Sequence, residues 1–422
     1  MYNYKNIFKP LKFLNISFKK GQNFSVFLDY AAVVVLALTF VLAVMDAQFP
    51  LVTESGKGGL KWVVFLLFGF YCISKYRGKI KIVKIERISL LFVIFVGVVT
   101  LSTLYSSSDL KEGILRTISF WVLWSIAFVF PTPINPLNRI ILWSNILIAL
   151  SAIITIVCLF SLPLPFAVVG GRLKGITSNA NTLGSFAAIC SIAGLSYFFS
   201  FKRRLFGLLL TGVGLTCLFL SGSRSSMLAS FVSICLLSAI QGKSKMLFKK
   251  IIILSLSAII FIGAYHYFDQ LKMNSTLYVK RQWDLHSREL IIRSQLEAWI
   301  RSPLIGNGLV KPGKIREEGR PGGESSFIDL LAVSGILGAG PLFAGLTMGC
   351  YTFFKIATVH RHNQPVKISY IAQALSIVTC IIVNSVGEGY MAAVGSILPI
   401  YVWIMCGVAS HIKILRNKSL RQ

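Results

Sequence analysis

Apolar residues form long, uninterrupted runs from one end of the chain to the other, and short polar segments separate these runs. An α-helix needs about 20 successive apolar residues to cross the hydrocarbon of a bilayer. Because backbone groups in lipid must be hydrogen-bonded within their own segment, continuous runs predict helices rather than the strands of a barrel. The sequence therefore predicts an all-α, polytopic membrane protein with about twelve transmembrane helices. The predicted spans are 27–46, 60–74, 88–104, 113–130, 139–160, 181–200, 205–221, 225–240, 250–268, 326–354, 368–386 and 391–411.

The distribution of positive charge predicts how these helices are oriented. The chain has 43 Lys and Arg against 15 Asp and Glu, a net charge of +28. In a soluble protein this excess would suggest nucleic acid as a partner, but 55% of the residues are hydrophobic and only 14% are charged, which is too apolar for a soluble domain. With the N-terminus inside, the cytoplasmic segments carry most of the Lys and Arg, as the positive-inside rule requires. Both termini are therefore predicted to be cytoplasmic.

One polar segment, 269–325, is much longer than the other loops and is predicted to be extracytoplasmic. No small-residue cleavage site follows the first predicted span, so this span is expected to remain as an anchor. The predicted organisation is a basic tail over 1–26, helices one to nine within 27–268, the loop 269–325, helices ten to twelve within 326–411, and a tail over 412–422.

The long loop is predicted to be partly helical. Over 285–301, the apolar residues Leu285, Ile292, Leu296 and Trp299 recur at helical spacing. Residues 302–325 are rich in Gly, Pro and charge, which is typical of irregular structure. At about 100° per residue, Arg288 falls inside the apolar stripe. An arginine on the buried face of an interfacial helix needs an anionic partner.

Polar groups concentrate at the predicted outer ends of the helices, whereas the spans contain almost no ionisable residue at mid-depth. Ion-coupled transporters usually place such residues near the midplane, so this pattern favours a site at the outer membrane boundary. Four segments stand out there: GGRLKGITSNANTLG over 170–184, SGSRSS over 221–226, SPLIGNGL over 302–309 after the Arg288 helix, and RPGGESSFIDLLAVSGILG over 320–338.

These four segments, in this order and on these loops, resemble the O-antigen ligase and O-antigen polymerase superfamily of bacterial membrane glycan-assembly proteins. The resemblance is clearest over roughly 165–340. It implies a membrane-embedded, GT-C-like inverting glycosyltransferase that uses no metal or other cofactor. The implied donor is a glycan on undecaprenyl diphosphate, and the acceptor is a glycan or lipid hydroxyl outside the bacterial cytoplasmic membrane. Membrane lipids and other envelope polysaccharide assembly proteins are the further expected partners, and nucleic acid is not.

The arginines of the family motifs match Arg172, Arg224 and Arg288, which the resemblance implies contact the diphosphate of the carrier. Guanidinium groups bind phosphate oxygens bidentately and stay charged near lipid. Several of them can neutralise a leaving diphosphate where other transferases use a divalent metal. The predicted outer loops contain no DxD-type acidic pair, and the eight cysteines form no CxxC pair, so no metal site is predicted.

Ligases of this family carry a histidine at the start of span ten, where this chain has Glu324. A glutamate can also act as a general base, so Glu324 is the predicted catalytic residue. The difference favours a polymerase of lipid-linked repeats over a ligase that acts on lipid A core or protein. A non-catalytic lipid-glycan flippase is the alternative from a different class. The lower-ranked site residues are Lys174, Asn181, His286 and Arg320.

Each of these residues also has a structural interpretation. Arg172 and Arg224 would equally anchor helix ends at phospholipid headgroups. Arg288 would pair with Glu324 or Glu388. Glu324 would be an acid favoured at a helix N-terminus by the helix dipole. The remaining structural interpretations are loop shaping and capping of span six for Lys174, Asn179 and Asn181, and helix packing or a kink for Gly335, Gly338, Gly340 and Pro341.

Overall fold

The computed structural model describes most of the predicted helical core. The predicted spans 27–46 and 250–268, and most of 60–74, lie outside the described residues, as do Arg320 and Glu324. Over 277–288 the helical backbone is described without its side chains. The described residues are 63, 67, 70, 71, 86–106, 110–129, 136–200, 204–241, 277–309, 325–359, 365–389 and 396–419.

The described part of the chain is almost entirely helical, as predicted, with one short hairpin. A π-helical turn, η3 (Ser125–Val129), continues helix α4, and strands β1 (Val168–Val169) and β2 (Arg172–Leu173) form the hairpin. The helices are α3 (Arg87–Ser106), α4 (Leu110–Trp124), α5 (Pro136–Phe160), α6 (Ala180–Ser200), α7 (Arg204–Ser221), α8 (Arg224–Gln241), α10 (Leu277–Arg301), α11 (Ser326–Val359), α12 (Pro365–Asn384) and α13 (Ile397–Ser419).

Six of the described helices are long and apolar enough to cross a membrane: α3, α5, α6, α7, α8 and α11. Shorter apolar stretches, 113–129, 368–384 and 397–412, lie in the remaining helices of the bundle. Each predicted span that falls in the described part of the chain coincides with or overlaps one of these helices. The protein is therefore a multi-pass membrane protein of the all-α class.

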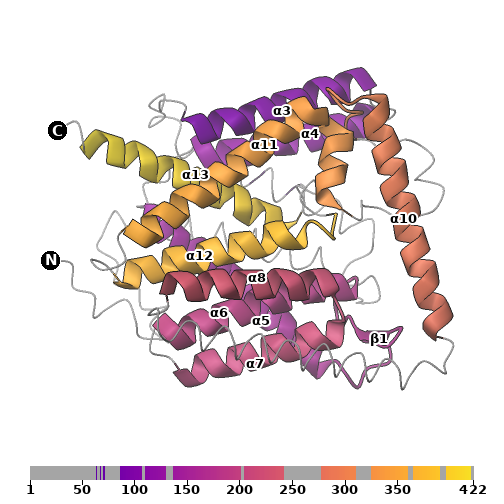
Figure 1. The fold of residues 1–422 in the computed structure, drawn as a ribbon, viewed down its shortest axis with the longest axis vertical. Coiled ribbons are helices and arrows are strands. Elements are labelled where there is room, and N and C mark those ends of the chain that lie inside the picture. Colours follow the sequence, from indigo (N-terminus) through magenta and orange to yellow (C-terminus); the bar gives the residue numbers. More distant parts are fainter. Residues whose placement is uncertain are drawn as a thin grey trace.

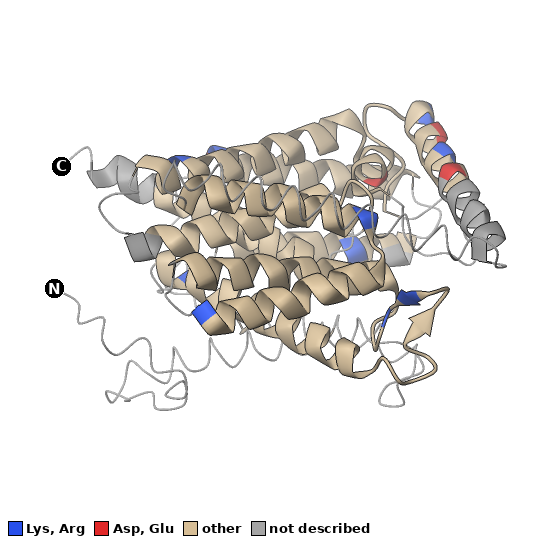
Figure 2. Ribbon diagram, turned by 60° about the horizontal axis from the view of Figure 1, so that its bottom comes forward, with Lys and Arg blue, Asp and Glu red and all other residues tan. Residues whose placement is uncertain are grey.

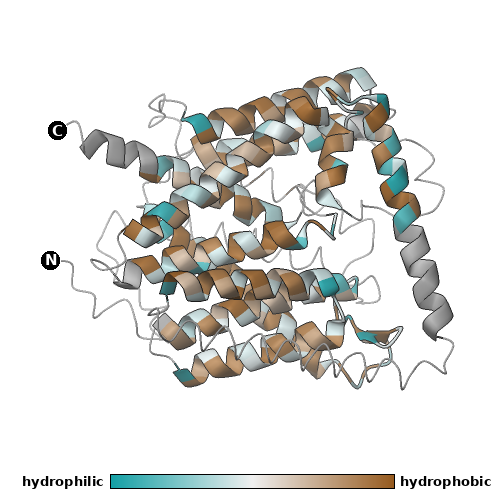
Figure 3. Ribbon diagram, viewed as in Figure 1, coloured by the Kyte–Doolittle hydropathy of each residue, from teal (hydrophilic) through white to brown (hydrophobic). Residues whose placement is uncertain are grey.

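The helices of the bundle run side by side, and α10 lies across one end of it (Figure 1). Charged residues in the described part lie mainly at the helix ends and along α10 (Figure 2). Hydrophilic residues also recur along the described part of α10, whereas the bundle helices are largely hydrophobic (Figure 3). Helix α10 is thus more polar than the helices of the bundle, and its predicted position at the membrane surface stays a prediction.

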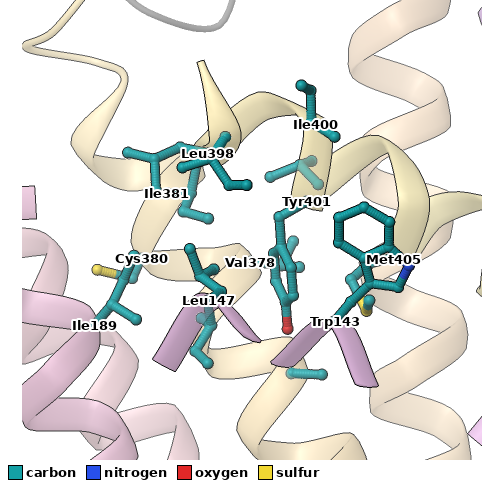
Figure 4. Close-up of a cluster of buried hydrophobic side chains, with 14 of the residues drawn as sticks. Trp143, Leu147, Ile189, Val378, Cys380, Ile381, Leu398, Ile400, Tyr401 and Met405 are labelled. Atoms are coloured by element: carbon teal, nitrogen blue, oxygen red, sulfur yellow. The ribbon is translucent and has the colours of Figure 1, made fainter. Parts of the chain in front are cut away.

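The core lies where α5, α6, α12 and α13 meet (Figure 4). The buried side chains of Trp143, Leu147, Val378 and Tyr401 pack together there. The Tyr401 hydroxyl is 2.8 Å from Ser144 Oγ, so the only polar atom of this large side chain has a partner. Because lipid is as apolar as the helix surfaces, such packing and interhelical hydrogen bonds hold membrane helices together.

Small residues bring α6 and α7 into close contact. A Cβ at Gly207 would lie 2.5 Å from the backbone nitrogen of Phe198, and one at Gly214 would lie 2.7 Å from that of Ser191. Both approaches are closer than real Cβ contacts allow. Only glycine at these positions lets the two backbones lie this near, which is the usual reason for small residues at helix interfaces in membranes.

Helix α10 is longer than predicted, because it begins at Leu277 rather than near 285. Its buried face is centred on Ile291 and Gln295, whereas Ile300 and Arg301 are exposed. The predicted apolar stripe is centred on Ile292 and Leu296, so the buried face is shifted by about one residue from the prediction. The predicted place of Arg288 on the apolar stripe falls on residues whose side chains are not described.

Candidate functional site

The N-termini of α6, α8 and α11 converge around the C-terminal end of α12. Asn384, the last residue of α12, donates from Nδ2 to Ser185 Oγ of α6 at 2.7 Å and accepts from Ser226 Oγ of α8 at 3.2 Å. The backbone N–H of Ser326, which begins α11, donates to the carbonyl of Ser385 at 3.0 Å. Each helix N-terminus carries a partial positive charge from the helix dipole and the C-terminal end of α12 a partial negative one, so positive helix ends outnumber the negative end of α12 at this junction.

The hairpin before α6 brings Arg172 to this junction. Val169 pairs with Arg172 across the turn formed by Gly170 and Gly171, both at positive φ. Arg172 donates from Nε to the Ser221 carbonyl at 2.8 Å and from Nη2 to Asn181 Oδ1. The side chain therefore ties the hairpin both to the end of α7 and to the start of α6.

The turn between α7 and α8 presents Arg224 at the first position of α8. Gly222 has φ +59°, and a Cβ there would lie 3.3 Å from Nε of Arg172, so the two arginine segments are in contact. Ser223 Oγ donates to Ser226 Oγ at 2.8 Å within the first turn of α8. Arg224 itself is exposed. A cation at a helix N-terminus is unfavourable in isolation, and the Arg172 segment adds a second positive charge close to it.

Two of the lower-ranked residues lie in the same region. Asn181 accepts the hydrogen bond from Arg172, and its carbonyl accepts one from Ser185 Oγ at 3.0 Å. Asn179 accepts hydrogen bonds from the backbone N–H and the hydroxyl of Thr182, at 2.8 and 3.0 Å, so it caps α6 as predicted. Lys174 follows the hairpin directly, and its backbone N–H donates to the Ala167 carbonyl.

The start of α11 is fixed to the loop after α12. Ser326 Oγ donates to the backbone carbonyl of Glu388 at 2.5 Å. Ser225 Oγ, next to Arg224, lies 3.5 Å from Oε1 of Glu388. Glu388 thus lies between the first residues of α8 and of α11. Glu324, the predicted base, precedes Ser326 by two positions in the sequence and lies outside the described residues.

Helix α10 contacts the first turns of α11. Gln295 is buried on α10, and its Nε2 donates to Oδ1 of Asp329 at 3.2 Å. The positions of Arg288 and His286 lie earlier on the same helix, where the side chains are not described. The structure thus brings Arg172 into contact with Asn181 and with the turn that precedes Arg224, and it places the helix that carries Arg288 against α11.

Residues 206–343 match the family model described as O-antigen ligase. This segment is similar to the O-antigen ligase family. The resemblance based on the four polar segments is thereby confirmed over this range. A comparison with the curated proteins found no match.

The O-antigen ligase segment begins within α7 and ends within α11, so it contains the Arg224 turn, all of α10 and the 302–309 loop. Two parts of the site lie outside it: the Arg172 hairpin before it and Asn384 after it. Both are joined to the O-antigen ligase segment by hydrogen bonds, to Ser221 and to Ser226 respectively.

Asn384 and Ser185 are site residues that the sequence analysis did not single out. Their signal is weak in the sequence, because both are uncharged and lie at the ends of apolar runs. A hydrogen-bonding side chain at the end of a transmembrane helix is nevertheless a candidate for interhelical contact. Glu388 was considered only as a partner for Arg288, whereas its described contacts are with Ser225 and Ser326.

Proposed function

We propose that this protein is a polysaccharide polymerase of the bacterial cytoplasmic membrane. It transfers a glycan from undecaprenyl diphosphate to an acceptor sugar hydroxyl on the extracytoplasmic side. The observation that carries the proposal is the position of the exposed Arg224 at the N-terminus of α8, beside Arg172. Two guanidinium groups and converging helix N-termini form a site suited to a diphosphate.

In the proposed reaction, the acceptor hydroxyl oxygen attacks the anomeric carbon of the donor glycan. A glycosidic C–O bond forms, the bond between that carbon and the diphosphate oxygen breaks, and the configuration inverts. The hydroxyl proton passes to Glu324, the general base. Undecaprenyl diphosphate leaves with the bonding electron pair, and Arg172, Arg224 and Arg288 stabilise its increased negative charge.

The arginines have different tasks in this proposal. Arg224 is exposed and contacts the diphosphate directly. Arg172, held by Ser221 and Asn181, keeps the α7–α8 turn in place and adds positive charge beside Arg224. Arg288 belongs to α10, and in this proposal it acts from that helix. Arginine stays charged near lipid, so this site needs no metal to neutralise the leaving group.

A ligase is the second candidate, since the matched family is described as O-antigen ligase. The acceptor distinguishes the two. Purified protein is incubated with undecaprenyl-diphosphate oligosaccharide, alone and with lipid A core. A polymerase yields a ladder of longer lipid-linked glycans from the donor alone, whereas a ligase yields product only with the core. Movement of intact donor across liposomes without transfer to either acceptor would contradict both and favour a flippase.

A further inference from the structure

Helix α11 is broken at Gly335, which has φ 57° and ψ −169°, a non-helical conformation within an otherwise helical segment. In Figure 1 the short part of α11 before the break and the long part after it run in different directions. A break of this kind frees backbone groups that the helix would otherwise pair. The carbonyls of Ala332 and Val333 would accept from the N–H groups of Ile336 and Leu337 in an unbroken helix.

The loop 303–308 pairs with all four of these groups. The N–H groups of Asn307 and Gly308 donate to the carbonyls of Ala332 and Val333, at 2.8 and 2.9 Å. The N–H groups of Ile336 and Leu337 donate to the carbonyls of Pro303 and Leu304, at 2.9 and 3.0 Å. We call this loop the strap. Broken helices at membrane depth are tolerated only where such partners exist, so the break and the strap require each other.

The strap lies too close to the break for side chains on either backbone. A Cβ at Gly335 would overlap the Leu304 carbonyl group, and a Cβ at Gly306 would overlap that of Val333. Both glycines have positive φ, +57° and +74°. The residue that follows the strap is fixed to α3, because the N–H of Leu309 donates to Thr103 Oγ1 at 3.2 Å.

One side chain in the strap connects two helices. Asn307 Nδ2 donates to the carbonyl of Ala298 in α10 at 2.6 Å and to that of Ala332 in α11 at 3.2 Å. The Ala298 carbonyl is among the last four of α10, which have no partner within the helix. Asn307 therefore joins the end of α10 to the break in α11.

We propose that Asn307 is a positioning residue, which fixes α10 relative to the outer part of α11 through the strap. This inference rests on the proposed function, in which Arg288 on α10 and Glu324 before α11 act on the same donor. With Asn307 in place, both helices are held in one arrangement, together with the contact of Gln295 and Asp329. Without it, the backbone pairs of the strap with α11 remain, but the hydrogen bond that joins the strap to the end of α10 is lost.

The test compares Asn307→Ala and Asn307→Asp with Gln241→Ala. An aspartate has the same size as asparagine but its carboxylate donates no hydrogen bond. Gln241 is a matched control, because its Nε2 also donates to a helix carbonyl, that of Ser369 at 3.3 Å, between α8 and α12. Donor KM, kcat, and amide hydrogen exchange over 303–308 and 332–337 are measured for each variant.

Both Asn307 variants are expected to lower kcat by about 10²-fold, since misplacing reacting groups by about 1 Å has this effect. Donor KM is expected to change little, because the Arg172 and Arg224 region is untouched. Exchange should rise in both segments, and Gln241→Ala should leave all three quantities unchanged. Loss of turnover with unchanged exchange, or faster exchange with normal turnover, would overturn the proposal. If the unaltered protein transfers no glycan, the proposed function fails, and unchanged exchange in the Asn307 variants would still refute the positioning role.

Discussion

Asn384 and Ser185 are 199 positions apart in the sequence, and the Nδ2 of Asn384 lies 2.7 Å from the Ser185 hydroxyl. The same asparagine accepts from Ser226 Oγ. Because Asn384 ends α12 and its two partners lie in the first turns of α6 and α8, one buried side chain connects three helices at the candidate site. The hairpin that carries Arg172 leads into α6, and Arg224 begins α8, so Asn384 connects the two helices that carry the arginine segments.

Asn384→Leu is expected to destabilise the protein, because it leaves the hydroxyls of Ser185 and Ser226 without this partner. An unsatisfied buried polar group costs about 1–3 kcal/mol. Gln373→Leu, on the same helix, is the control. Gln373 is fully buried, and neither its Nε2 nor its Oε1 has a hydrogen-bond partner in the described structure. Thermal unfolding in detergent should show a lower Tm for Asn384→Leu and an unchanged or higher Tm for Gln373→Leu. The reverse order would contradict this account of the junction.

Gly335→Ala is expected to be strongly destabilising, because the added Cβ would overlap the Leu304 carbonyl group and would be held at positive φ. Gly212→Ala, on the exposed side of α7, has open space around its Cβ among the described residues. It should stabilise the helix by roughly 0.5–1 kcal/mol, since alanine has the better helix propensity. The yield of folded protein and the Tm are measured for both variants, and both quantities should fall only for Gly335→Ala. Equal tolerance of both changes would show that α11 does not need its break.

Arg224→Lys is expected to reduce glycan transfer about tenfold or more, because an ammonium group does not reproduce the bidentate contact of a guanidinium with phosphate. Arg204→Lys is the matched control. Arg204 is also exposed and also begins a helix, α7, whose other end lies beside Arg172. Transfer is measured at equal levels of protein in the membrane. Full activity of Arg224→Lys would support the headgroup-anchor interpretation of this arginine.

The predicted orientation is tested by labelling one exposed residue at each end of the bundle. Ser178 is exposed just before α6, and Thr358 is exposed at the end of α11. With both termini cytoplasmic, Ser178→Cys should react with an impermeant thiol reagent in intact spheroplasts, and Thr358→Cys only after lysis. The described native cysteines lie within apolar helices, and the unaltered protein provides the background. The opposite labelling pattern would reverse the predicted topology.

The sequence was sufficient to predict the helices and the polar segments of the site. Hydropathy alone places α3, α5, α6, α7 and α8, because each is a continuous apolar run. Arg224 was found because it lies in the polar segment SGSRSS, which matches a family motif at the predicted outer end of a helix. Asn179 as the cap of α6 was also predicted correctly, since capping depends only on local sequence.

What the sequence did not predict are contacts between distant segments. The 302–309 motif was identified as a polar loop, but nothing in its own pattern shows that its backbone pairs with residues 332–337. Gly335 was predicted to mark packing or a kink, and the structure has the break there. The break is needed because the strap, about 30 residues earlier in the chain, comes close to Gly335. Asn384 was not predicted either, because its hydrogen-bond partners belong to other helices that are distant in the sequence.

The central claim is that the protein transfers a glycan from a lipid diphosphate, with Glu324 as the base and arginines in place of a metal. The most direct measurement is transfer from purified undecaprenyl-diphosphate oligosaccharide in the presence of a chelator, with Glu324→Gln compared against Glu317→Gln. The account predicts transfer without divalent metal, a loss of about 10²–10⁴-fold in turnover for Glu324→Gln with donor binding retained, and normal turnover for Glu317→Gln. A strict metal requirement, or near-normal turnover by Glu324→Gln, would contradict it.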